Sequence, residues 1–407
     1  MSKRQSSSVI STENTLSEIV VKNPPLVGFR VIDFSTMIAG PFGTSILADY
    51  GAEVIKIEPR DSCDLMRFVG SQKNGMSGIF ALNNKGKRAL AMNTKSDKGQ
   101  EIAKKLIATA DVLVHNHRHG VMESMGLGYD QLREKMPNLI YVHIVGYGET
   151  GILANNKAYD NMIQAITGMG NAQGTPPEVV HQLVCDKITG HVVAQAVIAA
   201  LLARARGMAG GQKLSISMLD VATQFMWQDL GMDAALLDDD VSRSATIDKY
   251  YRTVTLKDGY CAVTPASDEE FSVWMRVLGL NNILEDERFN SIGTRFANAE
   301  ALIQLTDEAA KNVTVAEVEN AITNDSLPAA IFRPLEELPN HPQVRENGMF
   351  YVRDHPVAGN VREARQAPRF SETPLFVSTY APMHGEHTKE ILDSLGYWAR
   401  LFEEIVK

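Results

Sequence analysis

The chain has 407 residues, of which 40 are basic and 49 are acidic, so its formal net charge is −9. This acidic balance argues against a nucleic-acid partner, because nucleic-acid-binding proteins usually carry a basic surface. The length predicts two or three domains with a core that needs no disulfide or metal staple. Three cysteines fit a reducing compartment, so we expect a cytoplasmic protein, and their spacing shows no zinc motif.

The sequence shows neither of the two segments that would mark membrane insertion or export. The longest apolar stretch, residues 192–203, is interrupted by Gln195 and is shorter than the ~20 residues of a membrane span. Residues 1–25 lack the apolar segment of a secretory signal, and Glu13 and Glu18 are unlike a mitochondrial transit peptide. We therefore expect no membrane partner and interpret residues 1–25 as a disordered N-terminal tail.

From residue 28 onward, segments typical of strands alternate with segments typical of helices. Residues 29–34 form a β-rich run, and a helical pattern then begins at Pro41 and ends near Gly51. This alternation predicts an α/β fold with a doubly wound, Rossmann-like parallel sheet in a large domain of residues 26–225. The later strands are expected at 53–58, 88–92, 111–115, 139–145 and 212–216, and the helices at 96–110, 158–169 and 189–206.

The pattern changes after Asp220, where we predict a second domain. Lys257-Asp258-Gly259 lies between two β-rich runs and indicates a hairpin. We assign residues 226–244 to a linker, 245–335 to a smaller α+β domain, and 336–407 to a linker that returns to the large domain. Helical patterns in this half of the chain cover 222–237, 268–278, 299–311, 315–322 and 386–395.

Ligands of an open parallel sheet bind beyond the carboxyl ends of the strands, which are followed here by segments 35–40, 59–67, 116–120 and 146–151. The first segment has one glycine where a dinucleotide-binding loop needs three, which disfavours a nicotinamide enzyme. Isolated cations and amides near these ends suit a compact phosphate-bearing ligand. They are Lys56, Arg60, Arg67, Lys85, Lys87, Arg88, Asn116, Arg118 and Lys157.

Several motifs occur in an order and at spacings that match a known family. They are LVGFRVIDF at 26–34, AGP at 39–41, GAEVIKIEP at 51–59, NNKGKR at 83–88, DVLVHNHRHG at 111–120, MGLGY at 125–129, AYD at 158–160, VCDK at 184–187 and GEHT at 385–388. From about residue 26 to residue 395, the chain resembles the class III CoA-transferases, which include formyl-CoA transferase, the carnitine-pathway CoA-transferase and α-methylacyl-CoA racemase.

The resemblance implies a transferase that moves CoA between carboxylic acids through a covalent aspartyl intermediate. Asp186 stands at the place of the family's nucleophile, although its position alone would suggest a helix N-cap, where the helix end would help to keep it ionised. Tyr159 and Asp160 match the transferases' Tyr-acidic pair, and Asp160 would orient Tyr159 or CoA. The resemblance places CoA contacts at Met37, Ile38, Arg60, Arg88, Asn116, Arg118, Met125 and Lys157.

Racemases of the family carry a histidine where this chain has Tyr159, and a tyrosine with a pKa near ~10 is a poor base. Transferase chemistry is therefore favoured over racemase or isomerase chemistry; His143 and His181 are the other histidines considered as bases. A glycine-rich loop, as in formyl-CoA transferase, is missing between residues 220 and 335, which disfavours formyl-CoA as the donor. Arg118 could replace family arginines that are absent at Pro59 and Ser124.

Two further sets of residues are weaker candidates. Lys187 could bind an acyl carboxylate or a surface acid, and Gly168, Gly170 and Gly174 could supply backbone donors to an oxyanion. The resemblance also implies an interlocked homodimer with acyl-CoA and a carboxylic acid as substrates, no permanently bound cofactor and no metal. A nicotinamide-dependent oxidoreductase and a non-catalytic CoA-binding protein remain as alternatives at this point.

Overall fold

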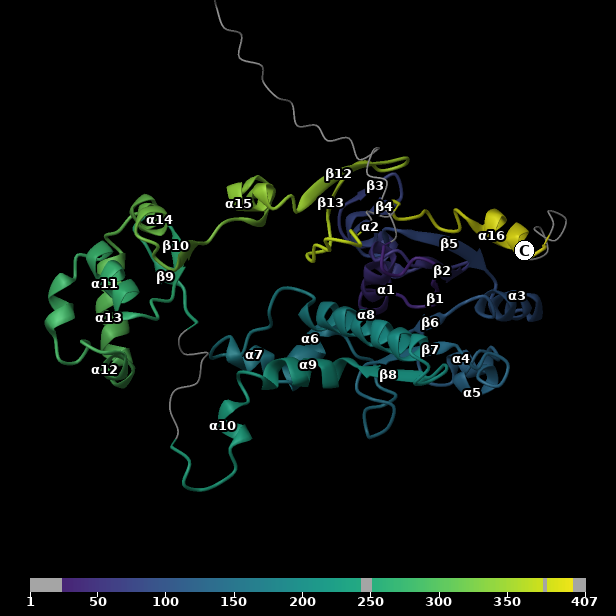
Figure 1. Ribbon diagram of the computed structural model, residues 1–407, viewed down its shortest axis with the longest axis horizontal. Helices are drawn as coiled ribbons and strands as arrows, with labels where there is room; N and C mark the ends of the chain where they lie inside the picture. The colour runs from purple at the N-terminus through teal and green to yellow at the C-terminus, as the bar shows by residue number, and fades with distance from the viewer. Residues whose placement is uncertain (1–23, 243–250, 376–378, 398–407) are drawn as a thin grey trace, which may run out of the picture. The chain divides into compact units, whose positions relative to one another are not determined.

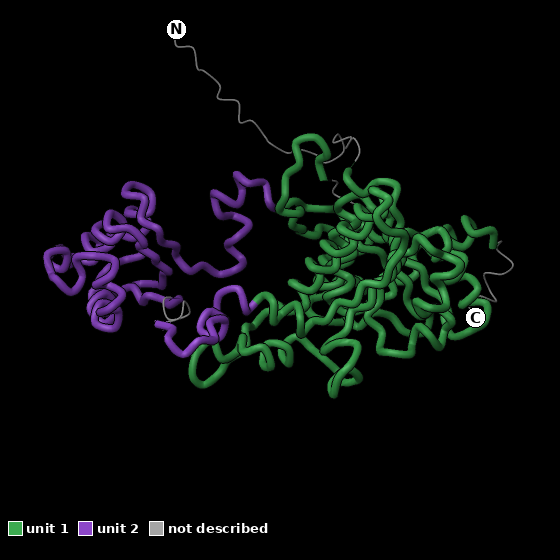
Figure 2. The backbone as a smooth tube through the Cα atoms, turned by 60° about the horizontal axis from the view of Figure 1, so that its bottom comes forward, with its two compact units in different colours: residues 1–225, 350–407 green, residues 226–349 purple. Residues whose placement is uncertain are grey.

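The computed structural model describes residues 24–242, 251–375 and 379–397. The N-terminal tail expected at residues 1–25 therefore lies outside the described residues, except for its last two positions. The chain divides into two compact units (Figure 2). Residues 1–225 and 350–407 belong to the large unit, and residues 226–349 belong to the small unit.

The large unit is built on a six-stranded sheet in which every neighbouring pair of strands is parallel (Figure 1). The strand order is β5-β2-β1-β6-β7-β8, so the direction of winding reverses between β1 and β6. This is the predicted doubly wound sheet, and each predicted strand is confirmed with ends that differ by a single residue at most. The strands are β1 (Arg30–Asp33), β2 (Glu53–Pro59), β5 (Lys87–Met92), β6 (Val112–His115), β7 (Ile140–Val145) and β8 (Lys213–Ser217).

Alternate side chains of the strands enter two separate cores, one on each face of the sheet. Ile32 and Leu113 pack with α3 and α16, whereas Val31 and Val112 pack with α1 and α8. Because both faces are covered, the buried strand residues are mostly apolar, and the buried charged ones, such as Lys56, Glu58 and Lys87, form ion pairs. The helices of this unit are α1 (Ala39–Asp49), α2 (Gly78–Asn84), α3 (Asp97–Ile107), α4 (Val121–Ser124), α5 (Tyr129–Leu132), α6 (Asp160–Ile166), α7 (Met169–Ala172), α8 (Val184–Ala205), α9 (Met218–Trp227) and α16 (Thr388–Ser394).

Glycines allow α1 and α8 to pack unusually close to each other. A Cβ atom on Gly43 would lie 2.8 Å from the carbonyl oxygen of Gly190, and one on Gly190 would lie 2.9 Å from that of Ala39. The contact brings the first turns of the two helices side by side. By length and composition alone α8 could cross a membrane, but its buried residues pack on α1 and on the sheet, as those of a core helix do.

Three helix predictions were wrong at an end and a fourth was wrong in its division; the helix expected at 96–110 ends at Ile107. The helix expected at 189–206 begins at Val184, so Asp186 lies in its first turn and Leu183 is the N-cap. The helix expected at 158–169 ends at Ile166, because Gly168 adopts a left-handed φ of +80° that a right-handed helix cannot continue. The segment at 222–237 forms two helices, α9 and α10 (Met232–Ala235), instead of one.

The small unit has its own core under a three-stranded antiparallel sheet of order β11-β10-β9. The predicted hairpin is confirmed, since Tyr260 of β10 lies opposite Thr255 of β9. The helices α11 and α14 contribute Trp274 and Val318 to the core. Elements of this unit are α10, β9 (Val254–Thr255), β10 (Tyr260–Val263), α11 (Asp268–Val277), α12 (Ile292–Ala297), α13 (Ala299–Ala310), α14 (Val315–Asn324), β11 (Ala329–Ile331) and α15 (Pro342–Glu346).

After the small unit the chain returns to the large one. A hairpin of β12 (Phe350–His355) and β13 (Gly359–Ala364), which the sequence did not predict, opens this segment. It is followed by α16, whose first residue, Thr388, accepts a hydrogen bond from the amide of Ala91 in β5 at 3.0 Å. The GEHT motif thus attaches the end of the chain to the edge strand of the sheet. The shorter elements of the large unit are β3 (Gln72–Lys73) and β4 (Met76–Ser77).

Candidate active site

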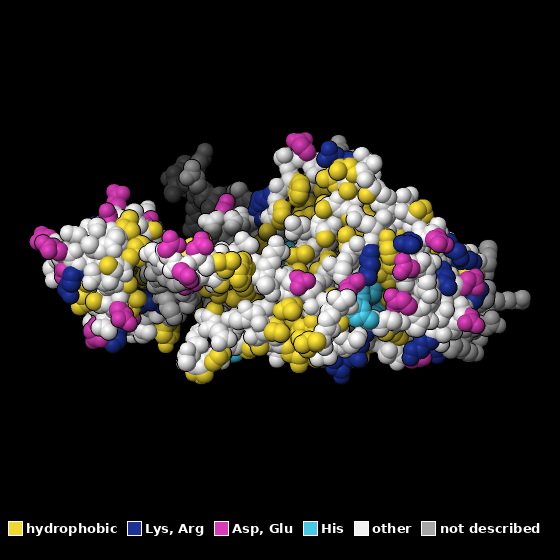
Figure 3. Space-filling view, turned by 90° about the horizontal axis from the view of Figure 1, so that it is seen from below, with side chains coloured by type: hydrophobic (Ala, Val, Ile, Leu, Met, Phe, Trp, Pro, Cys, Tyr) yellow, Lys and Arg dark blue, Asp and Glu magenta, His cyan; other side chains and the backbone are white. Residues whose placement is uncertain are grey.

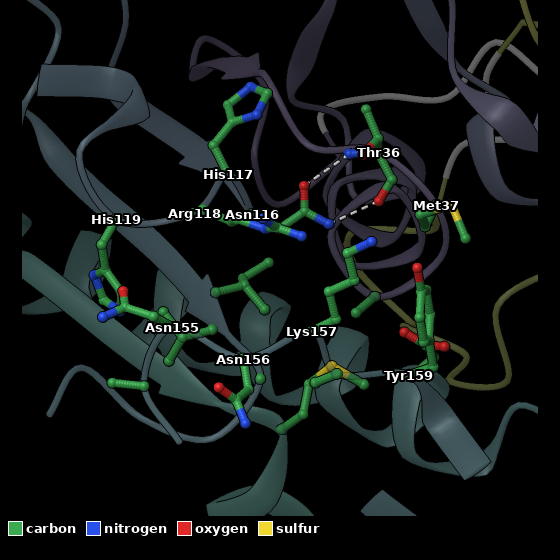
Figure 4. Close-up of a pocket in the computed structure, with 18 residues that line it drawn as sticks. Thr36, Met37, Asn116, His117, Arg118, His119, Asn155, Asn156, Lys157 and Tyr159 are labelled. Carbon is green, nitrogen blue, oxygen red and sulfur yellow. Dashed lines mark hydrogen bonds between the residues drawn. The ribbon is translucent and has the colours of Figure 1, made fainter. Parts of the chain in front are cut away.

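A pocket of about 330 Å³ lies at the carboxyl edge of the sheet, where the strand order reverses. β1 and β6 are neighbours there, so the loops that follow them lie side by side at the pocket. The loops after β7 and the first turns of α8 and α9 complete the lining. Six of the residues expected at the site line it: Asp186 and five that Figure 4 labels, Met37, Asn116, Arg118, Lys157 and Tyr159.

The other five expected residues do not line the pocket. Asp160 lies beneath it and is buried, Ile38 is buried at the start of α1, and Met125 belongs to the core on the α3 side of the sheet. Arg60 forms an ion pair with the neighbouring Asp61 at 3.4 Å. Arg88 lies near the amino end of β5, the edge opposite the pocket, and binds two glutamates, Glu53 at 2.6 Å and Glu390 at 2.9 Å.

Four of the cations that suggested a phosphate-bearing ligand serve another purpose. Their side chains are buried and each forms an ion pair inside the large unit. A buried charge is tolerated only when it is paired and hydrogen-bonded, so these groups hold the structure together and are not available to a ligand. The pairs are Lys56 with Asp64, Arg67 with Glu58, Lys85 with Asp49, and Lys87 with Asp33.

Two cations of the pocket remain available. The side chains of Arg118 and Lys157 are exposed, and within the described part of the chain neither forms an ion pair. Both side chains are drawn at the pocket in Figure 4. An exposed guanidinium and an ammonium group on facing loops can bind an anion such as a phosphate.

The loop after β1 is held by a side chain from the loop after β6. Asn116 accepts a hydrogen bond from the amide of Thr36 at 2.9 Å and donates one to its carbonyl oxygen at 2.8 Å (Figure 4). The next residue, Met37, has a left-handed φ of +69°, which costs a non-glycine residue roughly 1–2 kcal/mol. Asn116 therefore fixes a strained turn, in addition to lining the pocket.

Asp186 lies in the first turn of α8, half-buried, beside the first turn of α1. Burial and the nearby Asp160 carboxylate raise the pKa of Asp186 to about 7, while a hydrogen bond from the Ala39 N–H acts in the opposite direction. No cation among the described residues forms an ion pair with Asp186. The start of α8 should help to keep this carboxylate ionised, but desolvation and the Asp160 charge raise its pKa in spite of the helix end.

Asp160 joins three segments below the pocket. Its carboxylate accepts a hydrogen bond from the amide of Asp186 at 2.9 Å and another from the side chain of Gln164 at 2.6 Å. Gln164 in turn binds the carbonyl oxygens of Val180 and Gln182, just before α8. Asp160 is thus no cap of its own helix, since Tyr159 is the N-cap of α6, but it caps the first turn of α8.

The weaker candidates lie elsewhere. Neither Lys187 nor the three glycines of the segment 168–174 line the pocket. Lys187 donates a hydrogen bond to the side chain of Gln182 at 3.1 Å. His181 is exposed, and His143 lies behind the pocket wall, bound to Glu149 and to the carbonyl oxygen of His117. Neither histidine is placed to act as a base in the pocket.

Sequence reasoning missed a cluster of four histidines at the wall of the pocket, of which His117 and His119 line it. The rings of His115 and His143 stack with centroids 4.3 Å apart, and His117 and His119 lie within 6.2 Å of these two. Histidine side chains also reach the surface of the large unit beside acidic and basic groups (Figure 3). The available signal was the repeat of histidines at 115, 117 and 119, at the end of a predicted strand and in the segment that follows it.

The cluster shows no sign of a metal site. Within the described residues, no group of three or more His, Cys, Asp or Glu side chains is arranged to hold a metal ion. Neither ring nitrogen of His115 has a hydrogen-bond partner. Burial and the neighbouring histidines hold the pKa of His115 well below its usual value, and burial also lowers the pKa of His117 and of His143.

We predict that these histidines make the folded protein sensitive to acid. Their pKa values are lower in the folded than in the unfolded state, so stability is present above about pH 6.5 and is lost as the pH falls below it. His115→Phe keeps the ring stack without the titrating group, and its unfolding free energy should therefore vary less between about pH 7 and pH 5. Urea unfolding at several pH values measures this dependence. The exposed His181→Phe is the control, and an equal flattening in both variants would contradict the prediction.

Comparison with known proteins identifies the fold and the family. The chain is 31% identical to an acyl-CoA transferase of Fusarium pseudograminearum, over 91% of this chain and 85% of that protein. It is 29% identical to the succinyl-CoA:glutarate CoA-transferase of Mus musculus, over 90% of this chain and 86% of that protein. The crystal structure of a CAIB/BAIF family protein from Brucella suis matches with a TM-score of 0.80 and 28% identity, covering 92% of this chain and 100% of that one. The model of CoA-transferase family III matches residues 26–388, so this chain is an enzyme that belongs to CoA-transferase family III.

Proposed function

We propose that this chain is an acyl-CoA:carboxylate CoA-transferase whose nucleophile is the Asp186 carboxylate. The observation that carries the proposal is the position of that carboxylate. It lines the pocket at the reversal point of the sheet, shares that lining with Ala39, the first residue of α1, and has no cation paired with it in the described residues. A carboxylate with these surroundings can attack a carbonyl group that is brought into the pocket.

The reaction divides into two exchanges at Asp186. The carboxylate attacks the carbonyl carbon of an acyl-CoA and expels the CoA thiolate, which gives a mixed anhydride. The thiolate then attacks the aspartyl carbonyl, which releases the first acid and leaves an aspartyl-CoA thioester. The acceptor carboxylate attacks this thioester, and the thiolate returns to the acceptor's carbonyl group, so that the second acyl-CoA leaves and Asp186 is regenerated.

The pocket supplies what these steps need. In this scheme the N–H of Ala39, the first residue of α1 and a neighbour of Asp186 in the pocket lining, stabilises negative charge on an oxygen at the aspartyl carbon. Arg118 and Lys157 are the groups that would bind the phosphates of CoA, because they are the cations at the pocket that form no ion pair with another described residue. Acyl-CoA and a carboxylic acid are the substrates in this scheme, and no permanently bound cofactor or metal takes part.

Racemase chemistry is the less favoured alternative. Tyr159 lines the pocket at the place where a second base would be needed, and neither His143 nor His181 is in the lining.

The relatives differ in the acids that their names give. They are succinate and glutarate in the mouse protein, and (R)-2-hydroxy-4-methylpentanoate in a protein of Clostridioides difficile that is 30% identical over 91% of this chain and 96% of that protein. The acid pair of this chain is therefore to be found by experiment.

We predict that Asp186→Ala abolishes CoA transfer, with a loss of at least ~10³-fold, because no other carboxylate of the described residues lines the pocket. The wild-type protein is incubated with formyl-, acetyl-, succinyl-, crotonyl- and a branched acyl-CoA, and intact-protein mass spectrometry detects a CoA adduct. Borohydride should convert the aspartyl thioester into an alcohol that maps to Asp186.

Lys187→Gln is the matched control, since Lys187 is the next residue but lies outside the pocket. It should retain both adduct and turnover. Turnover by a folded Asp186→Ala protein would refute the proposed nucleophile. Exchange of the acyl α-proton with solvent, without any adduct in the wild type, would favour the racemase.

We predict that Asp160→Asn makes the reaction active at lower pH. Adduct formation requires ionised Asp186, so its rate should rise as the pH passes about 7 in the wild type. Asparagine can still accept the Asp186 amide but removes the charge that raises this pKa, so the midpoint should move down by roughly half to one pH unit. Stopped-time adduct measurements across pH give the midpoint. Asp130→Asn, at an exposed position, should leave it unchanged; an equal midpoint in all three proteins would contradict this role of Asp160.

We also propose that the protein acts in the cytoplasm as an interlocked homodimer, as the family resemblance implies. Large apolar side chains exposed on the single chain are consistent with a partner; they include Phe225, Trp227 and Leu237. We predict that interlocked chains separate only on unfolding, so dilution should not yield a folded monomer. Native mass spectrometry at falling protein concentration measures this, and a folded monomer that re-forms dimers reversibly would contradict it.

A further inference from the structure

We infer that Lys56 and Asp64, which do not line the pocket, are positioning residues: they fix the backbone turn at Ser35–Met37 so that the Ala39 N–H points at the Asp186 carboxylate. The inference rests on the proposed function for the role of Asp186. It adds that Lys56 and Asp64, which do not contact substrate, act on Asp186 indirectly, through the backbone of this turn.

The two side chains bind opposite ends of the turn. Lys56 donates a hydrogen bond to the carbonyl oxygen of Ser35 at 2.8 Å, and one oxygen of Asp64 accepts the amide of Met37 at 3.1 Å. The second oxygen of Asp64 forms an ion pair with Lys56 at 3.0 Å. Neither side chain has any exposed surface. The pair therefore closes a ring that contains the backbone from Ser35 to Met37.

Asn116 completes this ring by binding the N–H and the carbonyl group of Thr36. Every polar backbone group from the Ser35 carbonyl to the Met37 N–H thus has a side-chain partner. The three partners come from β2, the loop after β2 and the loop after β6. A loop held in this way cannot turn a peptide unit without breaking at least one buried hydrogen bond.

The turn needs such a support because the backbone of Met37 has a left-handed φ of +69°. This conformation is unfavourable for a residue with a side chain, so Met37 would leave it if it were not held. Ser35 is also held by Asp33, through its amide at 2.8 Å, but the amide of Met37 depends on Asp64. The first amide of α1, that of Ala39, follows two residues later. Ile38, the N-cap of α1, provides no side-chain hydrogen bond that could fix the helix start.

Asp64 is itself anchored on β2. Its amide donates a hydrogen bond to Glu58 at 2.9 Å, and Glu58 binds Arg67 through both carboxylate oxygens, at 3.0 and 2.6 Å. The same oxygen of Asp64 that binds Met37 accepts the amide of Met66. The Asp64 carboxylate is therefore held in place by β2. Through its hydrogen bond with Met37, the sheet also fixes the position of the turn at the pocket.

A second buried pair in the same unit provides a matched comparison. Lys85 and Asp49 form an ion pair at 2.6 Å with side chains that are 7% and 3% exposed, but neither binds the segment 35–39. Replacing both members of a buried ion pair by apolar side chains of similar size often preserves folding. The variants Lys56→Met/Asp64→Leu and Lys85→Met/Asp49→Leu therefore remove the same chemistry at two places, of which only one holds the turn.

The first readout needs no substrate. A carbodiimide with an amine modifies protonated carboxyl groups, and peptide mass spectrometry follows its labelling of Asp186 from about pH 5 to pH 9. In Lys56→Met/Asp64→Leu the midpoint should rise by roughly half to one pH unit, because the Ala39 N–H no longer stabilises the carboxylate. Lys85→Met/Asp49→Leu should keep the wild-type midpoint. Lys56→Met/Asp64→Asn, which retains an acceptor for Met37, should shift it less than the leucine variant does.

The second readout is the rate of CoA-adduct formation from succinyl-CoA, or from the donor of the panel that labels the wild type. Lys56→Met/Asp64→Leu should slow it about tenfold or more at neutral pH, with KM changed less than about threefold. An unchanged midpoint in a folded Lys56→Met/Asp64→Leu protein, or an equal shift in the control pair, would overturn the inference. If leucine prevents folding, Lys56→Met/Asp64→Ala is measured under the same criteria.

These measurements distinguish a failure of the proposed function from a failure of the positioning role of Lys56 and Asp64. If the wild type forms no adduct but the labelling midpoint moves as described, the positioning holds and the proposed function is wrong. If the wild type forms the adduct and the Lys56→Met/Asp64→Leu variant behaves like Lys85→Met/Asp49→Leu, the function stands and the positioning is wrong.

Discussion

The buried charges beneath the loop after β1 are the constraint on which the site depends. Burial alone would raise the pKa of Asp33, but Lys87 and Lys56 overcome this effect and lower it to about 2. The ammonium group of Lys87 also binds the carbonyl oxygen of Pro41 and the side chain of Asn84. Because a buried charge that loses its partner is very costly, the end of β1, the start of α1 and the neighbouring strands cannot move apart.

This constraint explains why the residues of one wall of the pocket are held in fixed positions, whereas those of the other wall are exposed to solvent. On the β1 side, backbone groups are held by buried side chains, and the glycine contact between α1 and α8 brings Asp186 to the first amide of α1. On the β7 side, Asn155, Asn156 and Lys157 are exposed. A site that transfers CoA needs both properties, since the reacting carboxylate must be fixed while a long substrate enters and leaves.

The sequence was sufficient to predict the sheet because both faces of it are covered, so short segments rich in apolar residues mark the strands, most clearly β6 and β7. The pocket's place followed from the topology, and the resemblance selected Asp186 and Tyr159, which do line it. What sequence could not provide is the direction of long side chains. Lys56 lies in the middle of β2 and Arg118 just after β6, yet the first side chain is buried against an acid and the second is exposed. Arg88 is the second residue of β5, which places it near the amino edge of the sheet, away from the pocket.

The start of α8 and the histidine cluster could not be predicted from the sequence for a related reason. α8 begins at Val184 because Asp160, from a different helix, accepts the amide of Asp186, and no local pattern records this contact. The histidine cluster needs β6 and β7 in register, with His115 opposite His143. Both features come from contacts between segments that are far apart in the chain, so they appear only when the fold is known.

The raised pKa of Asp186 is a compromise between two requirements of a carboxylate nucleophile. Desolvation makes the carboxylate more basic and more reactive, but each step upward in pKa reduces the fraction that is ionised. At a pKa of about 7, roughly half of the molecules carry the reactive form near neutral pH. Burial has the largest effect on this pKa and the Asp160 charge the next largest, and both raise it, whereas the Ala39 N–H lowers it. A cation next to Asp186 would keep it fully ionised but would also lower its basicity, and this is the physical reason to hold the carboxylate with a neutral amide.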